Sequence, residues 1–381
     1  MPAFPKEEFL GRVDETKRRM DAAGMDCLVV IDAANIFYLS GFDAHSAYVP
    51  QALVVIAGEE EPRLIVRDMD VPGDTAFMAA KHIHGYPEDY IAHPRSHPYD
   101  HFGDLFRAWG IASKRIGVEL SQLDVVSWGR LQQALPNVRW PDADGLVTWQ
   151  RLIKSPAELA YMKQAGQIAD AAMRVAIEKS VVGARECDVG AEVMAAQIRG
   201  LPEFGGDRPV TPHMPSGCPR VAAPHLAWTD AKLAPGTVTN VELGGFRHRY
   251  VTGLSRTIVQ GTPEERLQRL HLATKEAVDT VFDSVRPGWT CEEVEALFRK
   301  TTRKHGFEKK SRVGYAIGID WTEKTASLRP GDLTVLKPDM TFHLMAGMWY
   351  DSWGYVLSEA FRVTEGGIES FSRLPRDLFV K

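Results

Sequence analysis

The sequence predicts an α+β protein of two domains: an N-terminal α/β domain, and a C-terminal domain in which long helices pack against a strongly curved antiparallel sheet. The chain has 381 residues, more than a single hydrophobic core usually serves, so two domains are the default expectation. Its first part alternates helical and strand patterns, as α/β domains do. Its second part combines long apolar-periodic helices with a series of strand-like stretches.

The N-terminal domain is predicted from a helix followed by short apolar runs. A charged helical stretch from Lys6 to Ala23 comes first. Apolar runs of strand length, bounded by turn residues, then read DCLVVID, ALVVIAG and RLIVRD. A further run, RIGVEL, follows a helical segment. We expect these runs to form a mixed sheet, and we place this domain at residues 1–152 and the second domain at residues 153–381.

Capping residues mark the helices of the second domain. Ser155 is a capping serine, followed by a proline that the first helical turn tolerates and by Glu158 three places later. Thr290 and Glu293 repeat this signal for a second long helix, which ends at Gly306. Strand-like stretches lie between and after these helices: TVTNVELGG, YVTGLSRTIVQG, MTFHLMAG and YVLSEAFRVT.

Composition and charge argue against several classes of protein. The formal net charge is −5 and no lysine-arginine run occurs, so a nucleic-acid partner is not expected. The N-terminus is charged throughout, which argues against a signal peptide, and no stretch is apolar enough for a membrane span. The four cysteines lie far apart without CxxC spacing, which argues against a zinc cluster or a disulfide framework. We expect a cytoplasmic protein that binds neither nucleic acid nor membrane.

Several motifs of the second domain occur in a familiar order. They are WQRLIKSPAELAYM, PGTVTNVELGGFRHRYVTGLSRTIVQG, GYAIGID, and LKPDMTFHLMAGMW followed by FRVTEGG. In this order they resemble the signatures of the pita-bread family, which contains aminopeptidase P, prolidase, methionine aminopeptidase and creatinase. The N-terminal part resembles the creatinase and aminopeptidase P type. The resemblance implies a creatinase-like N-terminal α/β domain and a C-terminal pita-bread domain.

The resemblance also locates a former metal site. Metallopeptidases of this family hold two metal ions with two aspartates, a histidine and two glutamates, ligands that suit divalent cations. The corresponding positions of this sequence carry Glu242, Gly253, Tyr315, Met345 and Ser358. Glycine and methionine cannot replace a hard ligand. The resemblance therefore implies a metal site converted to another use, with no metal ion and no cofactor.

Two outcomes of such a conversion are known in the family. One is metal-independent hydrolysis of an amidine or guanidine carbon, as in creatinase and the ectoine hydrolases; the other is a catalytically silent binding module. His225, in PSGCPRVAAPH, stands where the family keeps an active-site histidine. A histidine can take a proton from water near neutral pH and return it to a leaving amine. A lone histidine is more often structural, but this motif favours a general acid–base.

Glu242 is the main carboxylate candidate. It lies between Val241 and Leu243 on a predicted strand, so its side chain faces the opposite side of the sheet from theirs. A solvent-facing glutamate is the ordinary interpretation of such a position. The resemblance instead implies that the carboxylate faces the former metal cavity, where the ectoine hydrolases also have a glutamate. There it would pair with a substrate amidinium or add to the amidine carbon as a nucleophile.

Other residues complete the predicted site. Glu359, next to a former ligand position, is the second carboxylate candidate, and Tyr315 offers a phenol donor. Tyr48 lies in a loop that, in the family, reaches into the active site of the partner subunit, so the resemblance implies a homodimer. A partly buried structural tyrosine is the alternative interpretation of Tyr48. Arg256 is interpreted as an ion-pair partner rather than a catalytic group.

Particular residues separate two metal-independent branches of the family. Creatinase has a phenylalanine and an arginine that clamp the creatine carboxylate, where this chain has Ala47 and Val49. Dispersed segments such as PHLAWTD, FHLMAGMWYDSWG and PRDLFVK resemble the ectoine hydrolases instead. The chain departs from that pattern at His45, Ala47, Val251 and Val356, and small apolar replacements should enlarge or dry the pocket.

The sequence thus predicts a metal-independent hydrolase that opens a small cyclic amidine, an ectoine-like compatible solute, at a C–N bond. His225 is the predicted general acid–base and Glu242 the amidinium partner or nucleophile. The substrate-binding candidates are Tyr48, Tyr315, Val251 and Val356. The alternatives are a creatinase-type amidinohydrolase, an Xaa-Pro peptidase-like hydrolase acting on another small substrate, and a silent binding module.

Overall fold

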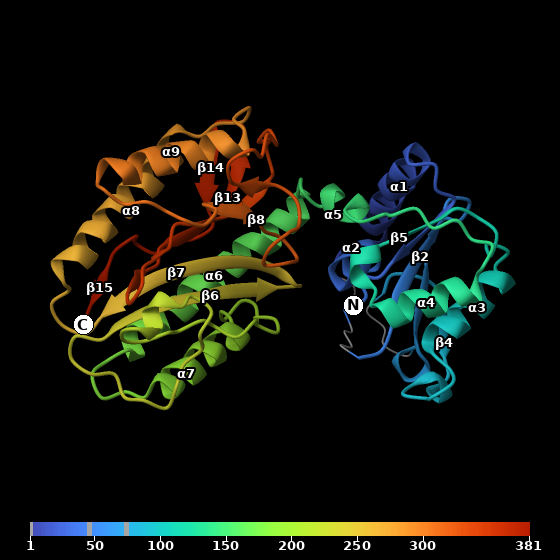
Figure 1. The fold of residues 1–381 in the computed structure, drawn as a ribbon, viewed down its shortest axis with the longest axis horizontal. Helices are drawn as coiled ribbons and strands as arrows, with labels where there is room; N and C mark the ends of the chain where they lie inside the picture. The colour runs from blue at the N-terminus through green and yellow to red at the C-terminus, as the bar shows by residue number, and fades with distance from the viewer. Residues whose placement is uncertain (1–2, 44–47, 72–75) are drawn as a thin grey trace. The chain divides into compact units, whose positions relative to one another are not determined.

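The computed structural model describes residues 3–43, 48–71 and 76–381. The chain divides into two compact units, Met1–Arg151 and Leu152–Lys381 (Figure 1). This division falls one residue before the boundary expected from the sequence. Within the described ranges, no helix is both long and apolar enough to cross a membrane.

A five-stranded mixed sheet organises the first unit. Its strands are β1 (Cys27–Val30), β2 (Ala52–Ile56), β3 (Arg63–Arg67), β4 (Ile83–Tyr86) and β5 (Ile116–Val118). They lie in the order β4-β3-β2-β1-β5. β1 pairs antiparallel with β2 and parallel with β5, whereas β3 pairs antiparallel with β2 and parallel with β4. The predicted mixed sheet is confirmed; the apolar runs did not indicate β4, whose sequence IHGY is largely half-buried.

Helices cover the first unit's sheet and supply much of its core. They are α1 (Lys6–Ala22), α2 (Ala33–Ser40), α3 (Pro98–Ala108), α4 (Val125–Ala134) and α5 (Leu146–Gln150), with short 3-10 turns η1 (Asp68–Asp70), η2 (Ala80–His82), η3 (Glu88–Tyr90) and η4 (Leu120–Gln122). Phe102 and Phe106 of α3 are fully buried against strand residues such as Val29 and Val54. Burial of this apolar surface is the main force that holds helix and sheet together.

Four long helices surround the sheet of the second unit (Figure 1). They are α6 (Pro156–Lys179), α7 (Glu186–Arg199), α8 (Glu265–Ser284) and α9 (Cys291–Lys304), with a 3-10 turn η5 (Arg220–Ala222). Both predicted helix starts are confirmed, because Ser155 and Thr290 each form a capping box with the glutamate three residues later. Gly306 follows α9 with φ 80°, the left-handed conformation that ends helices.

The large sheet of the second unit consists mainly of antiparallel pairs. Its strands are β6 (Val238–Arg247), β7 (Tyr250–Val259), β8 (Gly314–Ala316), β9 (Ser327–Leu328), β10 (Thr341–Met345), β13 (Ser358–Thr364), β14 (Gly367–Ser370) and β15 (Phe379–Val380). The order is β15-β7-β13-β10-β8-β9, and β6 and β14 pair with β7 and β13. β15 runs parallel to β7. A separate hairpin joins β11 (Met348–Trp349) to β12 (Gly354–Tyr355).

One face of this sheet packs against helices through two hydrophobic clusters, and the other face carries the functional site. Val241 and Leu254 pack in a hydrophobic cluster with residues of α6 such as Ala172. Phe342 and Phe361 pack in a second cluster that includes residues of α8 and α9. Side chains alternate along each strand, so the neighbours of these core residues project from the opposite face. The functional site lies on that opposite face.

Candidate active site

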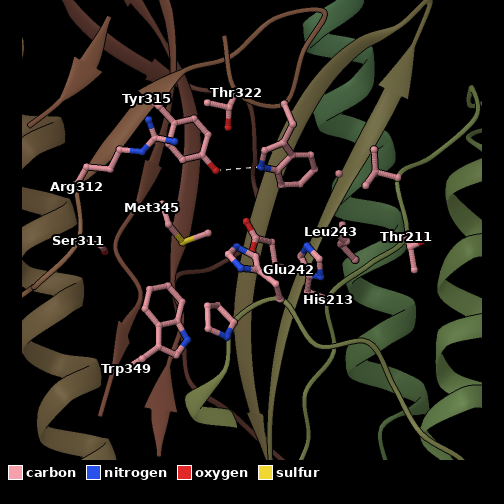
Figure 2. Close-up of a pocket in the computed structure, with 15 residues that line it drawn as sticks. Thr211, His213, Glu242, Leu243, Ser311, Arg312, Tyr315, Thr322, Met345 and Trp349 are labelled. Carbon is pink, nitrogen blue, oxygen red and sulfur yellow. Dashed lines mark hydrogen bonds between the residues drawn. The ribbon is translucent and has the colours of Figure 1, made fainter. Parts of the chain in front are cut away.

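A cavity of about 420 Å³ lies beside β6, β8 and β10 (Figure 2). Both its polar and its aromatic lining residues come from segments far apart in the sequence. The lining residues include His213, His225, Glu242, Arg312, Tyr315 and Trp349. The structure therefore brings together three residues singled out from the sequence: His225, Glu242 and Tyr315.

The Glu242 carboxylate is buried in the cavity wall without a polar partner. Its exposed fraction is 8%, and among the described residues no hydrogen bond or ion pair reaches its carboxylate. Desolvation by burial raises the pKa of Glu242 to about 7. A carboxylate that is half-ionised near neutral pH and faces an open cavity is poised for a cationic ligand or for proton transfer.

Two histidines stand next to Glu242 on segments that precede β6. His213 and Glu242 exchange two backbone hydrogen bonds of 2.9 Å each. The ring centroids of His213 and His225 lie 5.3 Å apart in an edge-to-face arrangement. Burial, and then the nearby His225, lower the pKa of His213, which favours its neutral form. The sequence analysis missed His213, since its backbone pairing with Glu242 leaves no pattern in the sequence.

The former metal position is filled by a histidine that the sequence analysis also missed. His343 is fully buried, and a Cβ placed on Gly253 would lie 2.9 Å from its ring carbon Cε1. The ring contacts the Tyr315 hydroxyl through Nδ1 at 3.1 Å and the Ser358 hydroxyl through Nε2 at 2.7 Å. Three of the five former ligand positions thus surround one imidazole ring.

The residues around His343 do not fit a divalent metal pair. Burial lowers the pKa of His343 to about 3, so its ring is neutral. Both ring nitrogens are already hydrogen-bonded to hydroxyl groups. Of the other three ligand positions, two hold glycine and methionine, and Glu242 alone keeps a carboxylate. In the described part of the chain, no cluster of three histidine, cysteine, aspartate or glutamate residues is arranged to hold a metal ion.

The hydrogen bonds around His343 fix the direction of the Tyr315 proton. Ser358 donates to Ser255 at 2.9 Å, so its oxygen accepts from the His343 Nε2–H. A neutral imidazole has one donor nitrogen and one acceptor nitrogen, so Nδ1 accepts the Tyr315 proton. Trp321 donates its indole N–H to the same phenol oxygen at 3.0 Å. In this arrangement His343 accepts the Tyr315 proton, and Trp321 and Thr322 both hydrogen-bond to the phenol, so the role of Tyr315 as a phenol donor to a substrate stays a prediction.

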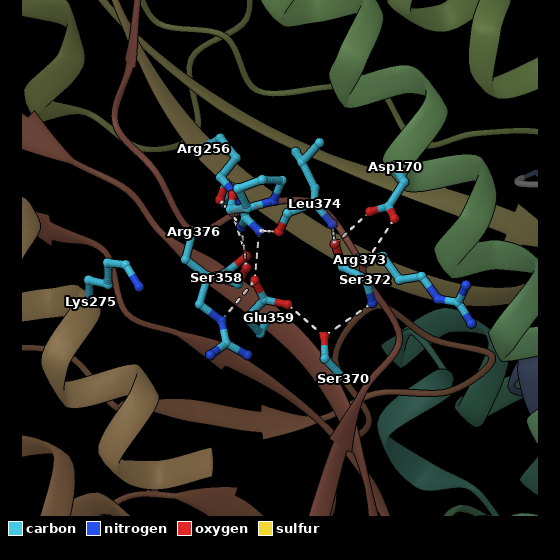
Figure 3. Close-up of polar contacts among 12 residues, drawn as sticks. Asp170, Arg256, Lys275, Ser358, Glu359, Ser370, Ser372, Arg373, Leu374 and Arg376 are labelled. Carbon is cyan, nitrogen blue, oxygen red and sulfur yellow. Dashed lines mark hydrogen bonds and ion pairs between the residues drawn. The ribbon is translucent and has the colours of Figure 1, made fainter. Parts of the chain in front are cut away.

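Glu359 does not line the cavity, which corrects the second carboxylate prediction. Ser358 and Glu359 are neighbours on β13, and alternation sends their side chains to opposite faces of the sheet. Glu359 forms a buried ion pair of 2.6 Å with Arg256 and accepts a hydrogen bond from Ser370 (Figure 3). The interpretation of Arg256 as an ion-pair partner is confirmed. A carboxylate so completely paired serves the fold rather than the chemistry.

The other predicted substrate-binding residues, Val251, Val356 and Tyr48, do not line this cavity. Val251 and Val356 are fully buried and do not line the cavity directly. Val251 instead lies beside Gly244, and Val356 lies beside Gly347. Tyr48 belongs to the first unit, where it is 74% exposed and accepts a hydrogen bond of 2.9 Å from Arg67. The sequence departures at positions 45 and 47 lie outside the described residues.

Comparison with known proteins gives the family. Residues 160–365 match the family described as Metallopeptidase family M24. The chain belongs to family M24. Residues 12–153 match the domain described as Creatinase/Prolidase N-terminal domain. The creatinase-like and pita-bread architecture expected from the sequence is thereby confirmed, and this M24 protein is a member of a family of hydrolases.

Individual relatives of this M24 chain span its whole length. It is 42% identical over 381 residues to the "Uncharacterized hydrolase/peptidase y4tL" of Sinorhizobium fredii, covering 99% of this chain and 97% of the relative. It is 35% identical over 398 residues to the ectoine hydrolase of Halomonas elongata, covering 99% and 98%. The crystal structure of dipeptidase PepE from Mycobacterium ulcerans matches with TM-score 0.83 at 23% identity over 99% of both chains. At that identity the last match shows the fold alone.

Proposed function

We propose that this M24 protein is a metal-independent hydrolase that opens a small cyclic amidine, of the ectoine type, at a ring C–N bond. The observation that carries the proposal is the Glu242 carboxylate, buried in the cavity and unpaired among the described residues. Burial of an unpaired charge costs several kcal/mol, so such a group invites a cation. The 35% identity to an ectoine hydrolase supports an amidine as that cation.

The cavity suits a flat amidinium ring. Tyr315, Trp321 and Trp349 supply aromatic walls, and aromatic faces attract cations. An amidinium presents two N–H groups on one side, and the Glu242 carboxylate can accept both of them.

The reaction adds one water to the substrate. Water attacks the central amidinium carbon, its proton passes to His225, and the resulting tetrahedral intermediate places an oxygen on that carbon. His225 then returns the proton to one ring nitrogen as the C–N bond breaks. The hydroxyl proton of the intermediate passes to the departing nitrogen, so the product is an open chain with an amide at one nitrogen and an ammonium group at the other. In a second route, the Glu242 carboxylate attacks first and water later releases the product from the glutamyl adduct.

The assembly proposal concerns Tyr48. We propose that the protein is a homodimer in which the loop bearing Tyr48 completes the site of the partner subunit. The exposure of Tyr48 within its own unit supports this proposal, since 74% exposure of a tyrosine leaves its ring available for another contact.

The test is turnover without metal. Wild-type protein should add one water to ectoine or hydroxyectoine in the presence of a chelator, measured by mass spectrometry. Replacement of His225 by alanine should lower the rate by about two to four orders of magnitude. The exposed His305, which pairs with Glu276 outside the cavity, provides the control, and His305→Ala should keep full activity.

Two results would contradict the proposal. Hydrolysis only after addition of a divalent ion would favour an Xaa-Pro peptidase-like hydrolase. An absence of turnover, combined with a melting temperature that rises with an amidine, would favour a binding module.

A further inference from the structure

A second cavity, of about 540 Å³, lies within the first unit. All of its lining residues fall between positions 31 and 127, and none of them lines the candidate active site. Its volume is in the range of about 300–1,000 Å³ that is typical of small-molecule sites. The polar side chains in its wall include Asp32, Gln51, His97, Tyr99 and Asp124.

Two buried polar side chains in this wall lack partners. Gln51, just before β2, is 8% exposed, and its amide group forms no hydrogen bond with any described residue. Tyr99, on α3, is 2% exposed, and its hydroxyl group also has no hydrogen-bond partner in the described ranges. A buried polar group without a partner costs about 1–3 kcal/mol. Such groups are rare in folded proteins unless water or a ligand satisfies them, so both point to an occupant of the cavity.

His97 adds a hydrogen-bond donor beside Tyr99. Its Nδ1 accepts a hydrogen bond of 3.3 Å from the backbone N–H of Tyr99, at the start of α3. Burial lowers the pKa of His97, which favours the neutral ring. A neutral imidazole that accepts through Nδ1 carries its proton on Nε2, and no residue in the described part of the chain accepts that proton. The His97 and Tyr99 rings stack with their centroids 5.6 Å apart.

The charges around this cavity largely offset one another. Asp32 accepts two backbone hydrogen bonds from the first turn of α2, and Asp124 accepts two from the first turn of α4. A helix N-terminus is equivalent to about half a positive charge, which compensates part of each carboxylate. Arg151 also lies 3.8 Å from the Asp32 carboxylate. The described lining residues include no lysine or arginine that could bind an anion.

We propose that this cavity of the first unit binds a small uncharged molecule with several hydroxyl groups, a polyol or a simple sugar. The inference goes beyond the proposed function, because it places a second ligand on a unit that supplies none of the proposed chemistry. A hydroxyl group both donates and accepts, so one such ligand can satisfy the Gln51 amide, the Tyr99 hydroxyl and the His97 N–H. An ammonium ligand only donates, and it would leave the amide N–H groups and the imidazole N–H unpaired. An anion would meet two carboxylates.

Calorimetric titration of the full chain tests this proposal. The probes are myo-inositol, D-mannitol and D-glucose, with the diamine putrescine as the cationic comparison. At least one of the three hydroxylated probes should bind with one-to-one stoichiometry, and putrescine should not bind. Gln51→Leu and Tyr99→Phe should each weaken that binding by about 3- to 10-fold, since each removes one or two hydrogen bonds to the ligand.

Matched variants separate loss of a contact from loss of structure. Tyr90 is half-buried and Gln268 is exposed, and neither lines this cavity, so Tyr90→Phe and Gln268→Leu should bind the probe as wild type does. Gln51→Leu and Tyr99→Phe remove no hydrogen bond within the described protein. Without ligand, their melting temperatures should therefore equal or exceed that of wild type.

Four results would overturn the proposal. The first is that wild-type protein binds none of the three hydroxylated probes. The second is that Gln51→Leu and Tyr99→Phe bind the probe as tightly as wild type. The third is that putrescine binds and these two variants weaken its binding, which would make the cavity a cation site. The fourth is that both variants melt below wild type without ligand, which would mean that protein groups already satisfy the amide and the phenol.

Discussion

Replacement of Glu242 by glutamine tests the electrostatics of the cavity without any substrate. Burial raises the pKa of Glu242 from 4.5 to about 7. The folded state therefore binds more protons than the unfolded state between these values. The contribution of Glu242 to the free energy of unfolding is fully present below pH 4.5 and is lost as pH rises through 7. The difference of about 2.5 pKa units, at 1.36 kcal/mol each, corresponds to a loss of about 3 kcal/mol at alkaline pH.

Glu242→Gln keeps the size of the side chain and removes its charge. The variant should therefore escape this loss, and its advantage in unfolding free energy over wild type should grow by about 2 kcal/mol between pH 5 and pH 8. For a unit of this size, 1 kcal/mol shifts the melting temperature by about 2–4 °C. The melting temperature of the variant, relative to wild type, should rise by about 4–8 °C over that pH range.

Thermal unfolding of both proteins at intervals between pH 5 and pH 8 measures this difference. The exposed Glu203 lies outside the cavity, and Glu203→Gln controls for the general loss of one negative charge. Parallel pH curves for wild type and Glu242→Gln would refute the reasoning, since they would mean that the Glu242 carboxylate is solvated or paired in solution.

Two further predictions concern the former metal position and the assembly. Gly253→Ala should lower the free energy of unfolding by about 1–3 kcal/mol in thermal unfolding, because its Cβ would lie 2.9 Å from the buried His343 ring. Gly366→Ala is the control, because a Cβ at that position meets no atom within 4 Å. Equal melting temperatures for the two variants would contradict the filled site. Mixing inactive Tyr48→Phe with inactive Glu242→Gln should restore part of the ectoine hydrolysis in heterodimers, and proven subunit exchange without recovered activity would place both residues in one subunit's site or make Tyr48 irrelevant.

The sequence by itself determined much of the fold. The capping boxes at Ser155 and Thr290 start two long helices as predicted, because a capping box depends on residues three places apart. The apolar runs that begin at Cys27, Ala52 and Arg63 form strands as predicted, because a short apolar run bounded by turn residues is also a local pattern. The carboxylate at position 242 could also be assigned to a face of its strand, since alternation has a period of two residues.

The tertiary structure decided what the site contains. Alternation along β13 could be known, but the face that Ser358 presents to the cavity depends on the pairing of β13 with β7 and β10. That pairing removed Glu359 from the site and brought in His343. His213 and Arg312 joined the cavity because segments far apart in the sequence meet around one curved sheet. Local sequence patterns determine helix caps and strand periodicity, because these depend on residues a few positions apart. The charge state of a buried group depends instead on the distant groups that surround it, and only the packing of the whole domain determines those groups.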